Sequence, residues 1–364
     1  MIKELEYWII LSVVQGIGIH KKLELLTIFG DAQKVFEAEK DALLRAGLTA
    51  ENYEQLNSDI VKEEAKRILD LCQKKNIKIV TMMDSEYPEM LKYIYDPPIV
   101  LYVKGDIPQS NAVAVVGSRR ASGYGIETAF KLSSGLAQVG VLVVSGLARG
   151  IDTAAHCGAL NESFTTVAVL GCGVDIPYPP ENKSLMERII QWGAVISEYP
   201  PGTPPAPYNF PSRNRIISGM SLGTLVVEAG LKSGSLITAK YALEQGRDVF
   251  AVPGNINHLN SMGTNRLIKD GAKIVLGVDD ILEELNFGLA PVEKVKVKKG
   301  KASDNDLNDE GRKIINALKI EDLYDEELSM KTAIPLNELF EILLDLELKG
   351  MIRKSITGKY ILLG

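Results

Sequence analysis

The sequence lacks any run of about 20 apolar residues, the length that a helix needs to cross a membrane. Its first residues, MIKELEYWII, lack the basic start and the small-residue cleavage site of a signal peptide. Its three cysteines, Cys72, Cys157 and Cys172, lie far apart and form no CxxC pair, so neither a disulfide framework nor a metal site is indicated. We therefore expect a cytoplasmic protein with buried, reduced thiols, no membrane contact and no metal.

A broad basic surface is also missing. The chain of 364 residues has 41 Lys and Arg against 47 Asp and Glu, which gives a net charge of −6. The positive excess is confined to residues 289–301, which contain the lysine-rich stretch KVKVKKGK. Any site for a polyanion must therefore be a local cluster of basic side chains.

The pattern of apolar residues changes near residue 77. Residues 1–76 have helical spacing, interrupted by Gly16-Ile17-Gly18, and Gly30 is placed to end a helix as a C-cap. After them, short runs rich in Val, Ile and Leu alternate with amphipathic helical segments at 124–138, 182–191 and 235–246. The runs are 77–82, 112–117, 141–145, 166–171, 193–197, 224–228, 248–252 and 273–276. Such nearly continuous apolar runs are typical of parallel strands buried on both faces, so we predict a doubly wound α/β sheet.

The chain therefore divides into three predicted domains and a linker. Residues 1–76 form an N-terminal helical domain, 77–288 the α/β domain, and 289–304 a basic linker. Residues 305–364 show three short helical patterns followed by a hairpin signal around Gly358, which predicts a winged helix.

Glycine-containing turns follow four of the predicted strands. Such strand-to-helix turns leave backbone N–H groups free at a helix N-terminus, where they can bind phosphate. A single turn of this kind is weak evidence, because a tight turn also needs glycine for packing alone. Together, the four turns predict a concave anion site at the carboxyl ends of the strands. They are 116–120, 145–150, 171–173 and 232–235.

The segment 209–220 adds further candidates. Arg213 and Arg215 could bind phosphates, and Phe210 could stack a base. The alternatives are core packing of Phe210 beside Pro211 and structural salt bridges for the two arginines.

Several long motifs, in the same order, resemble the DprA/Smf family over about residues 85–290. The motifs are SEYPEMLKYIYDPPIVLYVKGD (85–106), VVGSRRASGYG (115–125), SGLARGIDTAAHCGAL (145–160), GCGVDIPYPPEN (171–182), NFPSRNRIISGMS (209–221) and EAGLKSGSLITAKYALEQGRDVFAVPG (228–254). The resemblance implies an extended Rossmann-like fold that binds single-stranded DNA. It also implies that the protein protects incoming DNA and loads a RecA-type recombinase in natural transformation or recombination.

The resemblance also implies particular site residues. One departure is that Ala206-Pro207-Tyr208 stands where family members often have a lysine before the NFP segment. A homodimer interface is implied at Arg266, Leu267 and Ile268, although Leu267 and Ile268 could equally be core residues. The implied DNA-binding residues are Gly117, Ser118, Arg119, Arg149, Phe210, Arg213, Asn214, Arg215 and Lys240.

A catalytic role is the alternative. Glu228 ends the run 224–228, and together with Gly223-Thr224 before it this stretch resembles the GGxGTxxE loop of Rossmann-like nucleotide phosphoribohydrolases. Its carboxylate could orient water. The glycines of that loop are replaced by Met220-Ser221-Leu222, and no GxxxxGK[ST] motif is present. Asp152 is expected to cap a helix or to pair with an arginine, and His156 to be structural. We therefore predict a binding protein without catalytic residues or cofactors, with a nucleotide-processing hydrolase that uses Glu228 as the alternative.

The flanking domains allow two interpretations each. Residues 14–30 resemble a helix-hairpin-helix in which Lys21 and Lys22 would support phosphate binding, but a SAM-like domain for protein contacts fits equally well. The predicted recognition helix, 335–349, carries four carboxylates against one lysine, which would repel phosphates. We therefore expect the winged helix to have a protein-contact or a structural role rather than to read DNA.

Overall fold

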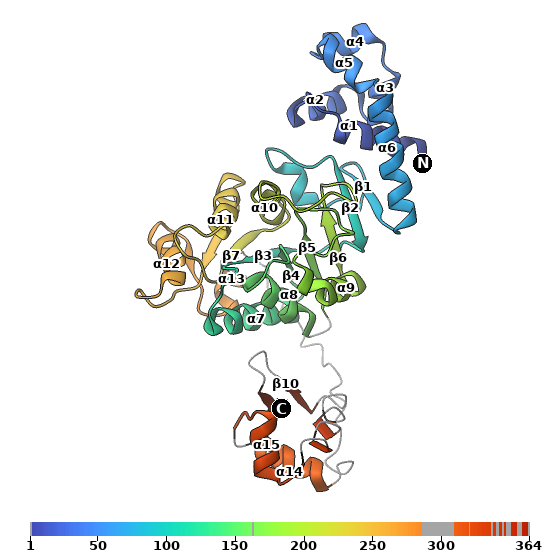
Figure 1. Ribbon diagram of the computed structural model, residues 1–364. Helices are drawn as coiled ribbons and strands as arrows, with labels where there is room; N and C mark the ends of the chain where they lie inside the picture. The colour runs from blue at the N-terminus through green and yellow to red at the C-terminus, as the bar shows by residue number, and fades with distance from the viewer. Residues whose placement is uncertain are drawn as a thin grey trace. The chain divides into compact units, whose positions relative to one another are not determined.

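The computed structural model (Figure 1) describes residues 2–161 and 164–285, and in the C-terminal part 309–319, 321–335, 338–339, 342–343, 346, 351–354 and 359–362. The chain divides into two compact units, residues 1–288 and 289–364. The predicted basic linker, 289–304, lies outside the described residues. The finer division at residue 76 stays a prediction.

The first unit begins with six helices. They are α1 (Ile2–Val13), α2 (Ile19–Phe29), α3 (Ala32–Glu37), α4 (Lys40–Arg45), α5 (Ala50–Leu56) and α6 (Asp59–Lys74). Gly30 ends α2 with a φ of 95°, and its N–H donates to the Leu26 carbonyl at 2.8 Å, which confirms the predicted C-cap.

Lys22, considered above as a phosphate contact, is buried between these helices. Its ammonium donates to the carbonyls of Ser12 and Val14 at 2.8 and 3.2 Å, at the C-terminal end of α1. Burial lowers the pKa of Lys22 to about 8. Lys22 therefore satisfies backbone groups of the helical region and is not exposed to a ligand.

A nine-stranded sheet forms the centre of the unit, in the order β1-β2-β6-β5-β4-β3-β7-β8-β9. The strands are β1 (Lys78–Thr81), β2 (Val100–Gly105), β3 (Ala112–Val116), β4 (Leu142–Ser145), β5 (Thr166–Val169), β6 (Ala194–Ser197), β7 (Gly223–Val226), β8 (Asp248–Ala251) and β9 (Lys273–Ile274). Strands β3 to β9 pair in parallel, whereas β2 pairs antiparallel with both β1 and β6. The sequence pattern therefore predicts every strand except β2, the one that runs against the others.

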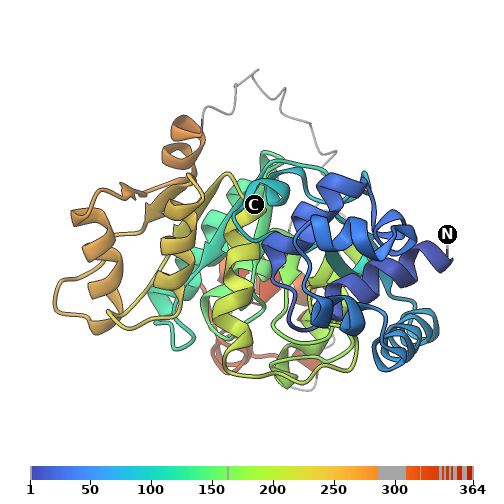
Figure 2. The same cartoon turned by 90° about the horizontal axis from the view of Figure 1, so that it is seen from above.

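Helices cover both faces of the sheet. The helices of the connections are α7 (Gly123–Gln138), α8 (Ile151–Asn161), α9 (Lys183–Trp192), α10 (Asn209–Gly219), α11 (Ser235–Glu244), α12 (Met262–Lys269) and α13 (Val278–Glu284). Helices α7, α8 and α9 lie together on one side, and Figure 2 shows α10 and α11 side by side on the other. Buried Val, Ile, Leu and Ala side chains of the strands pack against both layers, as the continuous apolar runs predict.

Strand β3 marks the reversal of the chain across the sheet. From β3 the chain proceeds outward through β4, β5 and β6, and then returns to place β7 on the other side of β3. The loops after β3 and β7 therefore diverge at the carboxyl edge of the sheet, which is where doubly wound folds bind ligands.

The C-terminal unit has its own core. Its described elements are α14 (Asp309–Leu318), α15 (Asp325–Thr332) and an antiparallel pair, β10 (Ile352–Lys354) with β11 (Tyr360–Leu362). Ile314, Leu328 and Leu339 are among the buried residues that hold them together. Much of the predicted recognition helix, 335–349, and the turn around Gly358 lie outside the described residues.

No described helix combines the length and the apolar character that spanning a membrane requires. Cys72 and Cys172 are buried and Cys157 is half-buried, all as free thiols. Burial raises the pKa of Cys72 to about 12 and that of Cys172 to about 11, so both are held protonated.

Candidate functional site

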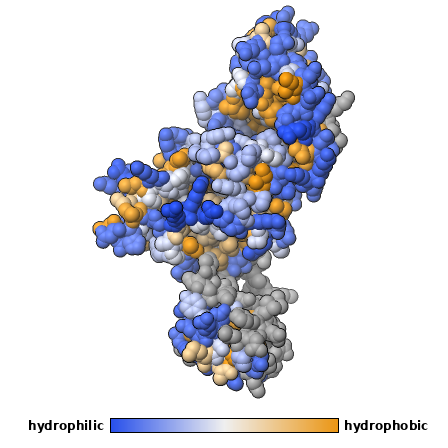
Figure 3. Space-filling view, viewed as in Figure 1, coloured by the Kyte–Doolittle hydropathy of each residue, from blue (hydrophilic) through white to orange (hydrophobic). Residues whose placement is uncertain are grey.

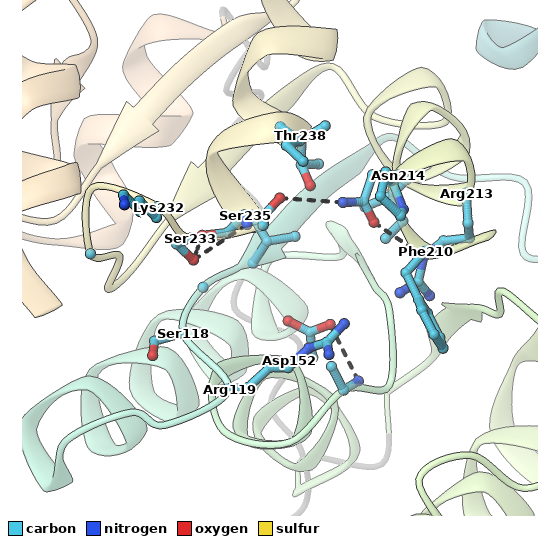
Figure 4. Close-up of a pocket in the computed structure, with 18 of the residues that line it drawn as sticks. Ser118, Arg119, Asp152, Phe210, Arg213, Asn214, Lys232, Ser233, Ser235 and Thr238 are labelled. Atoms are coloured by element: carbon cyan, nitrogen blue, oxygen red, sulfur yellow. Dashed lines mark hydrogen bonds between the residues drawn. The ribbon is translucent and has the colours of Figure 1, made fainter. Parts of the chain in front are cut away.

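A cavity of about 700 Å³ lies at the carboxyl ends of β3, β4 and β7. It is the position that the strand reversal at β3 predicts. Figure 4 shows the labelled side chains around it, which come from the turns that follow the strands and from α8, α10 and α11. In Figure 3, strongly hydrophilic residues gather over β3 and β7 in the middle of the view.

The turn after β3 forms one wall with Gly117, Ser118, Arg119 and Arg120. The Ser118 N–H donates to the carbonyl of Glu228 at 2.7 Å, and the Ser118 hydroxyl accepts from the N–H of Arg120 at 3.1 Å. These bonds fix the turn and leave the exposed Arg119 side chain at the cavity. Among the described residues, Arg119 forms no ion pair, so its charge is available to an anionic ligand.

The turn before α11, with Lys232 and Ser233, and the first residues of α11, with Ser235 and Thr238, form the opposite wall. The hydroxyls of Ser233 and Ser235 lie 2.8 Å apart, and the exposed Lys232 makes no ion pair within the described part of the chain. The partial positive charge of the helix N-terminus adds to these groups. The sequence predicts the turn 232–235 as part of the anion site, but none of these four residues is among the DNA-binding residues that the family resemblance implies.

Arg213 and Asp152 form the floor. The Arg213 guanidinium, only 3% exposed as a residue, donates to the carbonyls of Gly146 at 2.9 Å and of Val169. The Asp152 carboxylate accepts from the N–H groups of Gly146 and Ala148 at 3.1 and 3.3 Å. A Cβ on Gly146 would lie 2.5 Å from the Arg213 guanidinium, so only glycine admits this contact.

Burial and mutual attraction set the charges of this pair. Burial raises the pKa of Asp152 to about 6, against the opposing charge of Arg213. Burial lowers the pKa of Arg213 to about 10, against the opposing charge of Asp152. In the turn after β4, Asp152 accepts from the backbone N–H groups and Arg213 donates to a backbone carbonyl. The role of Arg213 in the cavity is therefore chiefly structural.

An aromatic cluster closes one side of the cavity. The rings of Phe210 and Tyr178 are stacked with centroids 5.4 Å apart and an interplanar angle of 27°, and the Arg119 guanidinium carbon lies 5.4 Å from the Phe210 centroid. Phe210 is half-buried rather than sealed in the core. Tyr178 lies in the predicted 171–182 motif but is absent from the predicted site.

Two of the remaining predicted residues lie at the cavity or beside it. Asn214 lines the cavity, and its side-chain amide donates to the Gly234 carbonyl at 3.4 Å. Arg149 lines a smaller adjoining cavity together with Arg119 and Phe210. Its hydrogen bond to Glu181 raises the pKa of Arg149 and lowers that of Glu181.

Arg215 and Lys240 lie elsewhere. Arg215 is buried, and its guanidinium pairs with Glu198 at 2.6 Å and with Asp96 at 3.0 Å. Burial alone would lower the pKa of Arg215, but the charge of Glu198 raises it. The salt-bridge alternative therefore describes Arg215, and direct DNA contact does not fit its position. Lys240 is exposed on α11, 3.5 Å from Glu244, and does not line the cavity.

Glu228, the candidate catalytic residue of the alternative, does not line the cavity either. Its carboxylate accepts from the Ser122 N–H at 2.8 Å, at the N-cap of α7, and the residue is buried. In this position the carboxylate of Glu228 stabilises the N-terminus of α7. His156 is buried on α8, with Nδ1 2.8 Å from the Thr166 hydroxyl, and burial lowers its pKa to about 3. The described residues contain no cluster of His, Cys, Asp or Glu that could hold a metal.

The fold and cavity thus define a doubly wound α/β protein with a basic, partly aromatic site at its strand reversal. Comparison with known proteins gives the family. The sequence profile of DNA recombination-mediator protein A matches residues 78–286, more than half of the chain. The chain belongs to this family, which confirms the resemblance to DprA/Smf proteins, and its role lies in DNA processing and recombination.

Individual relatives extend the match. The DNA processing protein DprA of Streptococcus pneumoniae is 47% identical over 209 residues, which are 57% of this chain and 74% of the relative. The protein Smf of Synechocystis is 38% identical over 289 residues, 78% of this chain and 73% of the relative.

Two solved structures are similar in fold. The crystal structure of DprA from Streptococcus pneumoniae matches with a TM-score of 0.67 and 37% identity, covering 78% of this chain and 98% of that one. A structure of DNA processing protein A from Helicobacter pylori, which describes single-stranded DNA binding by that protein, matches with a TM-score of 0.51 and 30% identity over 57% of this chain and 95% of that one.

Proposed function

We propose that this protein binds single-stranded DNA in the cavity at the carboxyl ends of β3, β4 and β7. The observation that carries the proposal is the combination of Arg119 and Lys232, cations without ion-pair partners in the described structure, with the half-buried ring of Phe210 in one cavity. Basic groups follow the phosphate backbone, and an aromatic ring stacks bases without strong sequence preference. The Helicobacter pylori relative, whose structure describes its binding of single-stranded DNA, supports the same ligand here.

The proposed contact set differs from the sequence prediction. Gly117, Ser118, Arg119, Phe210 and Asn214 remain as contacts, with Arg149 beside them. Lys232, Ser233, Ser235 and Thr238 join them, and Lys232 stands in for the lysine that the NFP segment lacks. Arg213 supports the floor, and Arg215 and Lys240 are left out.

Binding, rather than catalysis, is the function that the cavity supports best. A nucleotide hydrolase would need a carboxylate that reaches a bound ligand, and Glu228 is instead bonded to the start of α7. Asp152, the carboxylate that does line the cavity, accepts two backbone N–H groups and faces Arg213.

The biological role follows from the family. The protein would protect incoming DNA in the cytoplasm and load a RecA-type recombinase during transformation or recombination. Two exposed apolar side chains, Leu259 just before α12 and Met262 at its start, support a homodimer at this helix, which carries the predicted interface residues Arg266, Leu267 and Ile268. Leu267 also packs partly against the core, and Arg266 pairs with Asp270 at 2.8 Å.

The terminal domains are proposed to contact protein. The helical region 1–76 would be SAM-like rather than a phosphate-binding helix-hairpin-helix, because Lys22 is buried and Lys21 bonds to Glu24. Residues 305–364 would form a winged helix whose acidic predicted recognition helix does not read DNA.

The test is binding of a fluorescent oligothymidylate, single-stranded against duplex, across a salt series, with wild type, Arg119→Ala and Arg67→Ala. Arg67 is an exposed arginine of α6 and serves as the matched control. We expect salt-dependent preference for the single strand, weakened about 10-fold or more by Arg119→Ala and unchanged by Arg67→Ala. Equal binding of all three proteins, or turnover of nucleotides lost in Glu228→Gln, would contradict the proposal.

A further inference from the structure

The ring of Phe210 is in contact with three groups. The backbone of Gly171 passes so close that a Cβ there would lie 3.0 Å from Cδ1 of the ring. The ring of Tyr178 stacks on it with centroids 5.4 Å apart, and the guanidinium of Arg119 lies over it at 5.4 Å from the centroid. The ring that would stack a base is therefore already covered when no DNA is bound.

These three groups differ in how easily they can leave. Gly171 is buried backbone, and the Asn209 amide donates to its carbonyl at 3.0 Å. The 171–182 segment that carries Tyr178 is tied down by Asn182, whose amide donates to the Leu147 carbonyl at 2.9 Å and to the Thr153 hydroxyl at 2.8 Å. Arg119 is an exposed, long side chain on a turn and forms no ion pair in the described structure. Only Arg119 can swing off the ring without breaking a buried contact.

A guanidinium and a nucleobase are similar enough to occupy the same position on the ring of Phe210. Both are flat, delocalised groups that stack on aromatic rings. When the guanidinium moves aside, it can bond a phosphate or cover the outer face of the incoming base. The exchange therefore keeps the ring covered and gains charge-assisted contacts.

We propose that Arg119 holds the place of an unpaired base in the free protein, and that Tyr178 is the positioning residue that sets the ring of Phe210 for it. An unpaired base enters between Phe210 and Arg119, so that guanidinium, base, Phe210 and Tyr178 form one stack. A base within a duplex is already stacked and paired, so this slot between Phe210 and Arg119 selects single strands. The inference rests on the proposed DNA-binding function and goes beyond it by naming the slot, its occupant in the free protein and its support.

The experiment measures the binding of each protein variant to each of two DNA ligands. The proteins are wild type, Tyr178→Leu, Tyr178→Phe and Tyr93→Leu, which is a matched change of an exposed tyrosine on the 3-10 helix Glu89–Tyr93, away from the cavity. The ligands are an oligothymidylate of about 12 nucleotides and the same strand with abasic sites throughout. Thermal unfolding of each variant verifies that it is folded.

The slot predicts a loss that depends on the base. Tyr178→Leu should bind oligothymidylate about 10-fold more weakly than wild type, with the same salt slope, because the phosphate contacts remain. The loss should vanish on the abasic strand, and Tyr178→Phe and Tyr93→Leu should bind like wild type. An unchanged affinity of Tyr178→Leu, or an equal loss on both strands, would overturn the inference while leaving DNA binding in place. Absence of binding by wild type would overturn the proposed function and the inference with it.

Arg119 allows a second measurement that does not depend on the folding of Tyr178→Leu. Arg119→Lys keeps the charge of this exposed side chain but removes its plane. With 2-aminopurine in the oligonucleotide, wild type should quench the fluorescence of the bound base through stacking. Arg119→Lys should quench less while its salt slope stays the same. Equal quenching by both proteins would show that Arg119 is not part of the stack.

Discussion

Strands β3, β4 and β7 have a cavity at each edge of the sheet, and the two cavities are similar in size. At the carboxyl ends of β3, β4 and β7 the cavity measures about 700 Å³ and is lined by Arg119, Arg120, Arg213 and Lys232. At their amino ends a cavity of about 580 Å³ has Glu89 as its one ionisable lining residue in the described structure. Size therefore does not separate the two cavities, whereas charge does.

Chain direction explains the difference. At the carboxyl edge each strand leads into the N-terminus of a helix, where free N–H groups and the helix dipole favour anions. At the amino edge β4 and β7 follow the C-termini of α7 and α10, which favour cations. A parallel sheet thus has one edge suited to phosphate, and the basic side chains of this sequence lie at that edge.

The largest expected effect is on stability, at the floor of the carboxyl-edge cavity. Arg213→Met leaves the carboxylate of Asp152 buried without its counter-charge, and we expect a loss of about 3–5 kcal/mol in the free energy of unfolding. Urea unfolding measures it, with Arg67→Met as the exposed control. A loss below about 1 kcal/mol would mean that Arg213 does not support the floor.

The pH dependence of stability sharpens the same point. The pKa of Asp152 rises from 3.8 in the unfolded chain to about 6 in the folded protein, so between these pH values the folded protein binds more protons. Its contribution to stability therefore falls as pH rises from about 4 to about 6, by up to about 3 kcal/mol, and is constant above. The difference in unfolding free energy between wild type and Asp152→Asn should change through this window. A difference that is the same at every pH would contradict the assignment.

A smaller effect is expected from Lys232→Ala. Loss of one phosphate contact should weaken binding of single-stranded DNA about 10-fold and reduce the salt slope by about 0.7. Fluorescence anisotropy across a salt series measures both. Lys240→Ala removes an exposed lysine from α11, the helix that follows Lys232, outside the cavity, and should alter neither by a comparable amount. Equal effects of the two changes would place the DNA path along α11 rather than in the cavity.

The smallest expected effect comes from an attempt to equalise the two cavities. Gln109→Lys adds a cation to the amino-edge cavity but supplies neither a helix N-terminus nor an aromatic platform. We expect no more than about a two-fold gain in DNA affinity when it is placed in the Arg119→Ala background. Recovery of wild-type affinity would mean that charge alone, and not the carboxyl edge, determines binding.

Much of this architecture could be predicted from the sequence, because buried parallel strands need continuous apolar runs and their turns need glycine. The pattern of apolar runs alternating with helical segments does not predict the strand 100–105, because β2 follows β1 after only a 3-10 helix, Glu89–Tyr93, and runs antiparallel to it. The position of the site could be predicted as well, from the convergence of strand-end turns.

The roles of individual charged residues could not be predicted from the sequence. Arg213 and Arg215 stand two positions apart in one motif, and the sequence gives both the same chemistry. The structure buries one against backbone carbonyls and pairs the other with Glu198 and Asp96. Partners that lie far along the chain decide which arginine stays free, and no local pattern reports them. The sequence does not predict a role for Tyr178 either, because its contact with Phe210 is formed only in the folded protein.

The most direct test of the central claim is to map where single-stranded DNA touches the protein. An oligothymidylate containing 4-thiothymidine is cross-linked by near-ultraviolet light to the full-length wild-type protein, and the linked peptides are identified by mass spectrometry. We expect cross-links within 117–120, 171–182, 207–217 and 230–238, all at the carboxyl edge. Cross-links concentrated at the amino edge, in 88–90 and 107–111, or in the terminal domains would contradict it.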